Sequence, residues 1–498
     1  MPLRAGRLGL ATVPKLSTRK GISEVQLSHK PRSIAAKFDD PNLVSSAGLV
    51  PAMALAESVG LRDLADERLS VPTDKGANAG LKVSSLVAGM VAGADSIDDM
   101  TVLRHGGMGR VFGHAYAPST LGSFLRSFTF GHVRQLDAVA SRFLTGLAGK
   151  APLVGGAGGA ADGEFVLVDV DDTIVEVHGY AKQGAGFGYS GVRGLNTLLA
   201  TVTTSHSAPV IVAQRLRKGS CGSPRGAKRL VTDALKTVRG LPGVSSGRLL
   251  VRADSAFYGR GLVLAAVRAG ADVSVTVRLD KRIKATIAAI DDDPGTWTPI
   301  EYTDAIFDEQ TGQWVSRAEV AEIPFTAFAS RAKAERVPGR LVVRRIPDLN
   351  TDKNKASGQD TLFDVWRFHA FFTTTDPAVL DTVAADKTHR GHAVIEQVNA
   401  DLKNSALAHL PSGVFAANAA WLVLAVMAFN LTRAAATLAG GQLAKATTAT
   451  IRRKLINVAA RIASSARRIT LHLPLGWPWQ HHWAALFDKL CGPPATTP

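Results

Sequence analysis

FVLVDVDDTIVEV, residues 165–177, is a run rich in β-branched and aromatic residues, and it predicts a strand. Its alternation of apolar and polar positions is interrupted by Asp169, Asp171 and Asp172. Carboxylates inside an apolar strand cost free energy unless they bind something, so we expect a cation site on this strand. Because side chains alternate across a strand, Asp169 and Asp171 should share one face and Asp172 should lie on the other.

The residues that follow predict a regular order of strands and helices. We expect strands at residues 198–204 and 209–216, a helix at 227–238, a strand at 248–253 ending before Asp254, a helix near 262–269 and a strand at 272–278. This β-β-β-α-β-α-β order, with one acid on the first strand and another after the fourth, predicts an α/β fold: a ribonuclease H-like mixed sheet with flanking helices. GAGFGYSG, residues 184–191, lies between β-prone segments and predicts a tight hairpin rather than a phosphate-binding loop.

THRGHAVIEQVNADLK, residues 388–403, supplies a third acid on a predicted helix. Polar side chains at positions i, i+3, i+7 and i+14 fall on one stripe of this helix: His389, His392, Glu396 and Lys403. An adjoining apolar stripe can dock the helix on a core: Ile395, Val398 and Leu402. A docked helix with one carboxylate between cationic or titratable groups suggests a functional site, although a solvated helix face would show the same pattern.

Composition divides the rest of the chain. We expect a basic flexible arm at 1–40, a helical DNA-binding domain at 41–150, the two parts of the catalytic core at 161–280 and 365–436, a β-rich insertion at 281–364, and a basic region for DNA binding or dimerisation at 437–498. Predicted helices in the outer regions are 50–59, 81–92, 119–147 and 447–473. The start of the third, which exposes Arg126, fits a DNA recognition helix as well as an ordinary amphipathic one.

The charge of the chain favours a polyanionic partner. Its 58 Lys and Arg against 42 Asp and Glu give a net charge of +16, which points to nucleic acid before a membrane surface. Residues 1–37 and 437–498 each hold eight basic residues and one acid, so the excess lies at the two ends. The apolar run 414–431 predicts a buried helix rather than a membrane span, because it is short and contains two asparagines. The two cysteines exclude a disulfide framework or a thiolate zinc site.

The three acidic motifs together resemble those of DDE transposases of bacterial insertion sequences. DDT at residues 171–173 is similar to the D-x-T strand of that family, and RADS at residues 252–255 is similar to its second-acid motif. The spacing H-(2)-H-(3)-E-(6)-K across residues 389–403 resembles the Y-(2)-R-(3)-E-(6)-K signature of one branch, with His in place of Tyr and Arg. A β-rich insertion between the second and third acids is also typical of that branch.

The resemblance implies a cut-and-paste transposase that binds the terminal inverted repeats of its element and joins 3′-hydroxyl ends to target DNA. Phosphodiester cleavage of this kind uses two Mg²⁺ ions, for which Mn²⁺ can substitute. Asp171 is the expected bridging ligand, with Asp169 as its alternative, and Asp254 and Glu396 are expected to bind one ion each. The expected partners are double-stranded DNA, both transposon ends and target, and a second copy of the chain in a synaptic dimer, with no membrane. The expected location is the bacterial cytoplasm, associated with the nucleoid.

Ten basic or titratable residues are the candidates for contacts to DNA: His389, Arg390, His392, Lys403, Arg126, Arg452, Arg453, Lys454, Arg467 and Arg468. Lys403 and His392 are expected to hold phosphates beside the acids. By resemblance to related enzymes that form a DNA hairpin, Trp297 and Trp314 of the insertion are candidates for stacking on a flipped base.

Two other functions fit parts of the sequence. A haloacid-dehalogenase-like phosphatase would use Asp169 as a covalent nucleophile and Asp171 as a general acid. Such a fold needs a later acidic pair, and it leaves the basic ends and the 388–403 helix without a role. A catalytically inactive DNA-binding protein of the same fold is the second alternative, against which the presence of Asp171, Asp254 and Glu396 argues.

Overall fold

The computed structural model describes residues 27–72, 74–155, 164–244, 247–290, 293, 295–308, 313–347, 366–465 and 468–492. At 301–306, 308 and 313–317 it describes the backbone alone. The chain separates into two units, Met1–Pro41 and Asn42–Pro498. The described part of the first unit contains a 3₁₀ turn, Pro31–Ser33. The second unit contains the other elements treated below.

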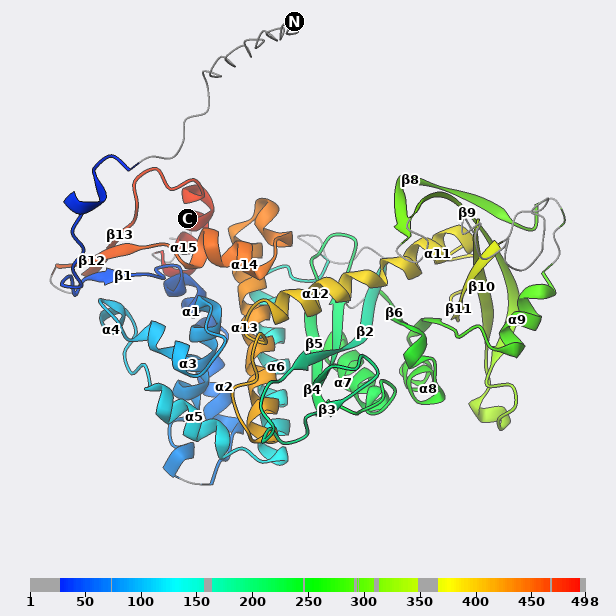
Figure 1. Ribbon diagram of the computed structural model, residues 1–498, viewed down its shortest axis with the longest axis horizontal. Coiled ribbons are helices and arrows are strands. Elements are labelled where there is room, and N and C mark those ends of the chain that lie inside the picture. The colour runs from blue at the N-terminus through cyan, green and yellow to red at the C-terminus, as the bar shows by residue number, and fades with distance from the viewer. Residues whose placement is uncertain are drawn as a thin grey trace, which may run out of the picture. The chain divides into compact units, whose positions relative to one another are not determined.

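Ten strands form one mixed sheet in the order β3-β4-β2-β6-β7-β11-β10-β9-β8, and β5 also pairs with β4 (Figure 1). Their bounds are β2 Phe165–Glu176, β3 Gly186–Phe187, β4 Arg193–Thr203, β5 Val210–Lys218, β6 Arg248–Ala253, β7 Asp272–Thr276, β8 Thr298–Asp308, β9 Gln313–Ala327, β10 Val337–Pro347 and β11 Trp366–Thr373. β2 runs antiparallel to β4 and parallel to β6, and β6 runs parallel to β7. The order β5-β4-β2-β6-β7 with these directions confirms the mixed α/β sheet expected from the sequence and is consistent with a ribonuclease H-like fold.

The predicted insertion, 281–364, extends this sheet in its described part. β11, which follows the insertion, pairs antiparallel with β7, and the insertion strands β10, β9 and β8 follow in turn. Pairing with β7 gives the ladder groups of that strand partners on both sides, which an edge strand would leave to solvent. The strands of the insertion therefore continue the central sheet.

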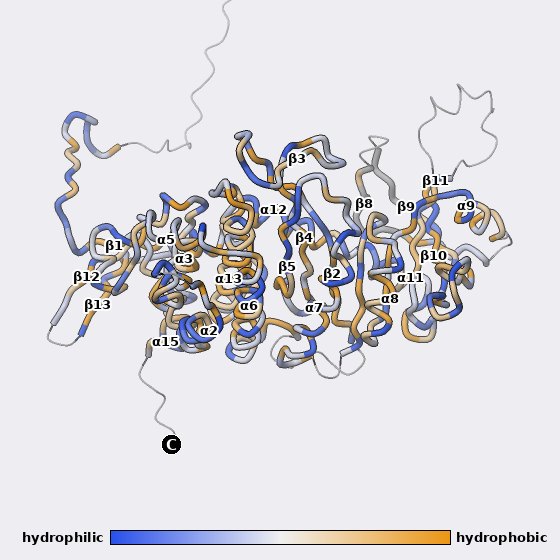
Figure 2. The backbone as a smooth tube through the Cα atoms, turned by 90° about the horizontal axis from the view of Figure 1, so that it is seen from below, coloured by the Kyte–Doolittle hydropathy of each residue, from blue (hydrophilic) through white to orange (hydrophobic). Residues whose placement is uncertain are grey.

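Helices flank the sheet and fill the space beside β5 (Figure 2). Their bounds are α1 Leu49–Ser58, α2 Leu61–Arg68, α3 Ala79–Ala92, α4 Met108–Val111, α5 Pro118–Arg126, α6 Phe130–Lys150, α7 Ala227–Arg239, α8 Arg260–Arg268, α9 Lys281–Ala288, α11 Thr382–Arg390, α12 Val394–Lys403, α13 Phe415–Ala439, α14 Thr448–Ile451 and α15 Gln480–Cys491. The helix predicted at 119–147 is in fact two helices. Thr129 separates them and caps α6 through a capping box with His132.

The apolar helix α13 lies at the centre of the packing, in contact with α3, α6 and β5. In the described residues it is the one helix long and apolar enough to cross a membrane, but 89% of its most apolar window is buried inside the protein. Its Asn430 accepts from the backbone N–H of Ile211 at 3.0 Å and donates to the carbonyl of the same residue at 2.8 Å. These bonds satisfy backbone groups of β5 beside α13 and confirm the predicted buried helix.

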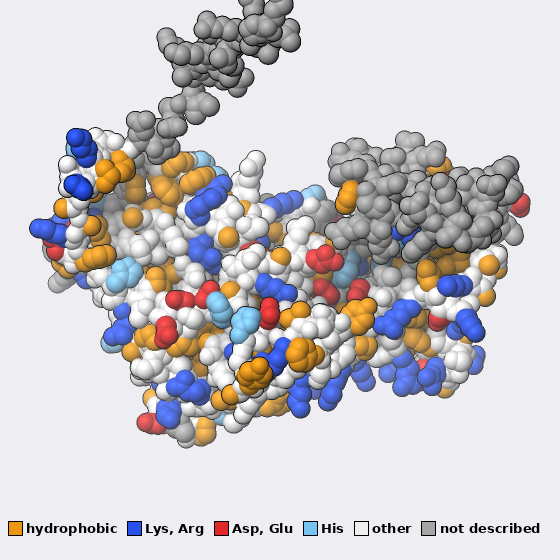
Figure 3. All heavy atoms as spheres, viewed as in Figure 1, with side chains coloured by type: hydrophobic (Ala, Val, Ile, Leu, Met, Phe, Trp, Pro, Cys, Tyr) orange, Lys and Arg blue, Asp and Glu red, His pale blue; other side chains and the backbone are white. Residues whose placement is uncertain are grey.

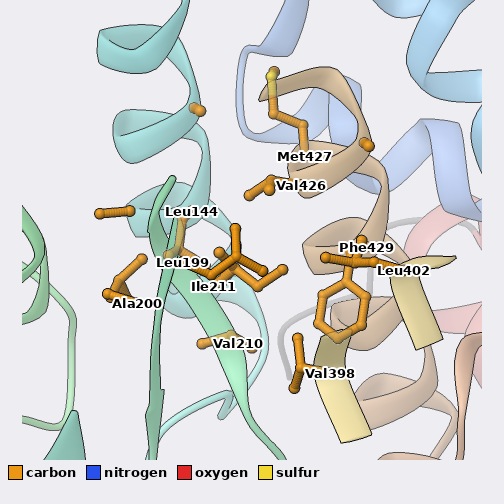
Figure 4. Packing of buried hydrophobic residues seen from close by; sticks show 14 of the residues in the cluster. Leu144, Leu199, Ala200, Val210, Ile211, Val398, Leu402, Val426, Met427 and Phe429 are labelled. Carbon is orange, nitrogen blue, oxygen red and sulfur yellow. The ribbon is translucent and has the colours of Figure 1, made fainter. Parts of the chain in front are cut away.

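The helix α12 docks through the apolar stripe that the sequence predicts. Ile395, Val398 and Leu402 are buried, at most 2% exposed. Figure 4 shows Val398 and Leu402 beside Phe429 of α13, with Ile211 of β5 nearby. Burying a side chain of this size contributes roughly 1.5–3 kcal/mol, so the stripe is sufficient to fix the orientation of α12 on the core.

The prediction of one basic helix at 447–473 is wrong. The chain forms α14, then a π-helical turn at Arg452–Ile456, then a hairpin of β12, Ala460–Ser465, and β13, Arg468–His472. β12 also pairs with β1, Leu43–Val44, in a separate three-stranded sheet. Alternating burial along β12 explains the difference, because Ala460 and Ile462 face the core while the basic residue between them is exposed, which is a period of two.

Candidate active site

Asp171 and Asp254 lie side by side on neighbouring parallel strands. The register pairs Val170 of β2 with Ala253, the last residue of β6, and the next residue in each segment is an aspartate. Both carboxylates line one pocket with a volume of about 1240 Å³. Acidic side chains gather near the middle of the molecular face in Figure 3, between groups of basic ones. The parallel pairing of β2 and β6 thus brings together two acids that are far apart in the sequence.

Burial disfavours the charge on both carboxylates. Burial is the main cause that raises the pKa of Asp171 to about 6; the charge of Asp254 also acts to raise this pKa, whereas a backbone hydrogen bond from Asp172 and the charge of His392 act to lower it. Burial likewise raises the pKa of Asp254 above its ordinary value. Asp171 accepts a hydrogen bond of 2.8 Å from Asn399, and Asp254 accepts one of 3.0 Å from the backbone N–H of Ala256. Neither carboxylate forms an ion pair with Lys or Arg anywhere in the described residues.

Asp169 has the opposite surroundings. Its side chain has no exposed surface, and Arg252 donates to both of its oxygens at 2.7 Å. His392 Nδ1 lies 2.9 Å from Oδ1 of the same carboxylate. With both oxygens engaged, Asp169 is not available as the alternative metal ligand. The phosphatase hypothesis loses its nucleophile for the same reason.

Arg252 also fixes the turn before α12, the helix that carries Glu396. It donates to the backbone carbonyls of Thr388 and Gly391, the latter at 3.2 Å. A Cβ on Gly391 would lie 2.8 Å from the guanidinium, closer than real Cβ contacts, so this close approach requires glycine. The ion pair between β2 and β6 therefore extends to the turn that precedes α12.

Asp172 faces the other side of β2, as the alternation predicts. It forms an ion pair with Arg217 of β5 and accepts hydrogen bonds from Asn196 at 2.7 Å and Ser223 at 3.0 Å. These partners compensate its charge, so it holds β2, β4 and β5 together.

Glu396 occupies the first turn of α12. The predicted continuous helix is interrupted before it by a 3₁₀ turn, Gly391–Ala393. Glu396 is exposed and has no hydrogen-bond or ion-pair partner in the described part of the chain. Two residues near it in the chain contact β2: His392, in the 3₁₀ turn, reaches Asp169, and Asn399, at i+3 on α12, reaches Asp171. The sequence contains a signal for Asn399, since residues three apart share a helix face, although Asn399 is not among the predicted site residues.

The described residues do not assemble the full predicted metal-ligand set: they contain no group of three or more His, Cys, Asp or Glu side chains placed to hold a metal ion. Asp171 and Asp254 meet in the pocket, and Glu396 is not among the residues that line it. Two partly desolvated carboxylates without a cationic counter-ion nevertheless fit a divalent cation, and Mg²⁺ prefers such oxygen ligands. Lys403 lines the same pocket, where burial lowers its pKa and the charge of Asp171 acts to raise it.

The prediction that His389 contacts DNA is wrong. Its ring stacks on Phe371, with centroids 4.1 Å apart, and its two nitrogens lie 2.8 Å and 2.9 Å from the hydroxyls of Ser274 and Thr276. Burial lowers its pKa to about 3, so it is neutral at physiological pH. A neutral ring with both nitrogens bonded to the sheet holds α11 in place and cannot bind a phosphate.

Further predicted contacts divide between structural and exposed positions. Arg390 pairs with the buried Asp386 at 2.8 Å, and Arg452 donates to the carbonyl of Val91 at 3.2 Å, so both have structural partners. Lys454 lies 4.8 Å from the ring centre of Trp479. The exposed members are Arg126, Arg453 and Arg468. Arg467 lies outside the described residues.

Trp297 does not fit the base-stacking role expected of it. It is 9% exposed, and the guanidinium of Arg345 lies 4.1 Å from its ring centre while Phe368 packs at 6.3 Å. The indole is thereby packed against Arg345 of β10 and Phe368 of β11. The side chain of Trp314 lies outside the described residues.

Residues 26–492 match a family model described as Transposase DDE domain group 1. The match spans most of the chain and includes all three acidic motifs. No curated protein matches the chain.

Proposed function

The chain belongs to the transposase DDE domain group 1 family, and we propose that it is the transposase of a bacterial insertion sequence that moves by cut-and-paste transposition. A transposase binds DNA, and its family is one of nucleases and strand-transfer enzymes that generally use divalent metals. The proposal adds the steps: binding of terminal inverted repeats, cleavage at the element ends, and transfer of the 3′-hydroxyl ends to target DNA. It also assigns the branch with the Y-(2)-R-(3)-E-(6)-K spacing, here with His at the first two positions.

One observation supports the proposal most strongly: Asp171 and Asp254 are adjacent by strand register, line one pocket, and lack a cationic partner in the described residues. We assign them as Mg²⁺ ligands, with Glu396 as the third. Held by these residues, Mg²⁺ would supply activation of the attacking oxygen and stabilisation of the leaving one. The protein supplies the carboxylates in fixed positions, and Asn399 orients Asp171 by its 2.8 Å hydrogen bond.

The Asp169–Arg252 pair is assigned a positioning role. It joins β2 to β6 and to the turn before α12, and it also holds His392. This arrangement fixes the strand that carries Asp171 and the helix that carries Glu396 relative to each other. Lys403 lines the pocket two turns beyond Glu396 and is assigned to a DNA phosphate.

The proposed partners follow from the charge of the chain. Exposed Arg126, Arg453 and Arg468 are assigned to the DNA backbone, and the net charge of +16 favours binding to duplex DNA in the nucleoid of the bacterial cytoplasm. Joining two element ends requires that both be held at once, so the proposed active species is a dimer on DNA.

The test is cleavage of a plasmid that carries the element with its own ends, in Mg²⁺. Asp171→Asn, Asp254→Asn and Glu396→Gln should each reduce cleavage at least about 10³-fold, which is about 4 kcal/mol of transition-state stabilisation. The matched control is Glu57→Gln, an exposed carboxylate on α1, which should cleave as the wild type does. Wild-type protein that binds these ends without cleaving them would support the inactive DNA-binding alternative instead. Full activity of any one acid variant would remove that residue from the site.

A further inference from the structure

Two exposed aromatic side chains stand at the rim of the acidic pocket. Phe187 is 65% exposed and Tyr189 is fully exposed, and both line the pocket that contains Asp171 and Asp254. Tyr180, on the same excursion between β2 and β4, is also fully exposed but does not line the pocket. Large aromatic rings in water forgo the stabilisation that burial would give, so rings gathered beside a site suggest that a ligand covers them.

The segment that carries these rings is anchored to the core. Phe187 belongs to β3, which pairs with Arg193 of β4, so the predicted hairpin at 184–191 is confirmed. The backbone N–H of Gly219 donates to the carbonyl of Gly184 at 2.9 Å. A Cβ on Gly219 would collide with the backbone of β3 and β4, so the glycine permits this close crossing. The hairpin therefore presents Phe187 and Tyr189 from a fixed position beside the acids.

The pocket combines the chemistry that a nucleotide requires. It has carboxylates for the metal-assisted reaction, the cations Arg278 and Lys403 for phosphate, and two aromatic faces for a base. Its volume of about 1240 Å³ exceeds the roughly 300–1000 Å³ typical of small-ligand sites, so a nucleotide and its neighbours can enter. Bases within a duplex are stacked on each other, and an aromatic ring can stack only on a base that has left the duplex.

We propose that Phe187 and Tyr189 form a stacking platform for an unpaired base of the DNA strand whose phosphate lies at Asp171 and Asp254. The platform replaces the buried Trp297 as the base-stacking element. The inference rests on the proposed DNA cleavage function, because the acids define where the strand lies. β3 is the strand at the edge of the sheet next to β4, and β4 pairs with β2, the strand that carries Asp171.

The test compares two DNA probes in Ca²⁺, which holds the complex without cleavage: a blunt duplex, and the same duplex with a short 3′ extension that contains 2-aminopurine. Stacking of this base on a ring quenches its fluorescence. Phe187→Ala and Tyr189→Ala should each weaken binding of the extended probe about 5- to 150-fold, the range for one lost aromatic stack, and should abolish the quenching. Binding of the blunt duplex should be unchanged.

Tyr180→Ala is the matched control, because it removes an equally exposed ring from the same segment outside the pocket. It should leave both probes bound as tightly as in the wild type. Tyr189→Phe should retain binding and quenching, since the ring and not the hydroxyl carries the contact. Equal losses for both probes in the Phe187 and Tyr189 variants, or no loss for the extended probe, would overturn the inference.

The binding readout also separates this inference from the proposed function. Wild-type protein that shows the aromatic-dependent quenching but no cleavage of element ends in Mg²⁺ would refute the proposed function alone. Cleavage without aromatic-dependent quenching would refute the stacking platform alone.

Discussion

Asp169 and Asp171 lie two residues apart on one face of β2, yet the protein surrounds their charges in opposite ways. Asp169 has no exposed surface and shares its two oxygens between Arg252 and His392. Asp171 receives a hydrogen bond from a neutral amide and stands beside a second carboxylate, which together with burial raises its pKa to about 6. The difference shows that the local compensation of charge, and not the residue type or the strand, separates a structural acid from one prepared to bind a cation.

From this comparison, the largest expected change in the free energy of unfolding is that of Asp169→Asn. This change leaves the guanidinium of Arg252, which is 2% exposed, without its anionic partner. Removing one member of a buried ion pair costs about 3–5 kcal/mol, so the free energy of unfolding should fall by that amount. The measurement is denaturant unfolding at neutral pH, with the midpoint and slope compared with those of the wild type.

Asp171→Asn is the matched control for that experiment. It removes a carboxylate of the same strand and face but has no cation to leave unpaired, and Asn399 can still donate to the new side-chain oxygen. Its stability in metal-free buffer should equal or exceed that of the wild type. A loss of less than about 1 kcal/mol for Asp169→Asn would mean that the Arg252 pair does not hold the strands, because exposed pairs are worth that little.

The sequence predicts the order of strands and helices along the core, the two aspartates of the pocket and the docking of α12, because these follow from local patterns of residue type and periodicity. It cannot show which of Asp169 and Asp171 is paired, since the partner Arg252 is 83 residues away and the pairing depends on strand register. His389 illustrates the same limit. Its spacing assigns it to a polar stripe, but packing against Phe371 decides that the ring is structural.

The end of the chain shows a second kind of limit. The basic segment 447–473 has helix-compatible composition, and pairing of β12 with β1 overrides it. That pairing joins residues more than four hundred positions apart, so no local pattern contains it. The periodicity of the sequence also does not predict the exposure of rings such as Tyr189, because exposure depends on where the hairpin lies on the folded surface.

A smaller effect is expected from the raised pKa of Asp171. A carboxyl with a raised pKa in the folded state contributes stability that is complete below its ordinary value of 3.8 and is lost as the pH rises through about 6. Asp171→Asn cannot titrate. In metal-free buffer the variant and the wild type should therefore be about equally stable near pH 4, and the variant should be more stable by about 1–3 kcal/mol near pH 7 to 8.

Thermal unfolding across this pH range, with the metal removed by a chelator, measures the difference. Saturating Mg²⁺ should stabilise the wild type at neutral pH and leave Asp171→Asn unchanged, because a ligand that binds only the folded protein raises its stability. A stability difference that stays constant with pH would contradict the raised pKa. A Mg²⁺ response in the variant equal to that of the wild type would show that the ion binds elsewhere.

The smallest effect concerns a second pair of neighbours, Arg452 and Arg453, which repeats the contrast between structural and available charge. Arg452 donates to the carbonyl of Val91, whereas Arg453 is exposed and has no partner in the described part of the chain. Arg453→Ala should leave the free energy of unfolding within about 0.5 kcal/mol of the wild type and reduce the slope of log affinity for DNA against log salt by about 1, because one phosphate contact is lost.

Arg452→Ala should give the opposite result. Loss of a hydrogen bond from a charged donor costs about 1.5–3 kcal/mol of stability, and the salt slope should not change, because this side chain is committed to the fold. Fluorescence anisotropy on a duplex probe at several salt concentrations, together with denaturant unfolding, measures both quantities. If Arg453→Ala leaves the salt slope unchanged while Arg452→Ala reduces it, exposure does not identify the DNA-binding cations of this chain. The contrast between paired and unpaired charges then holds only for Asp169 and Asp171.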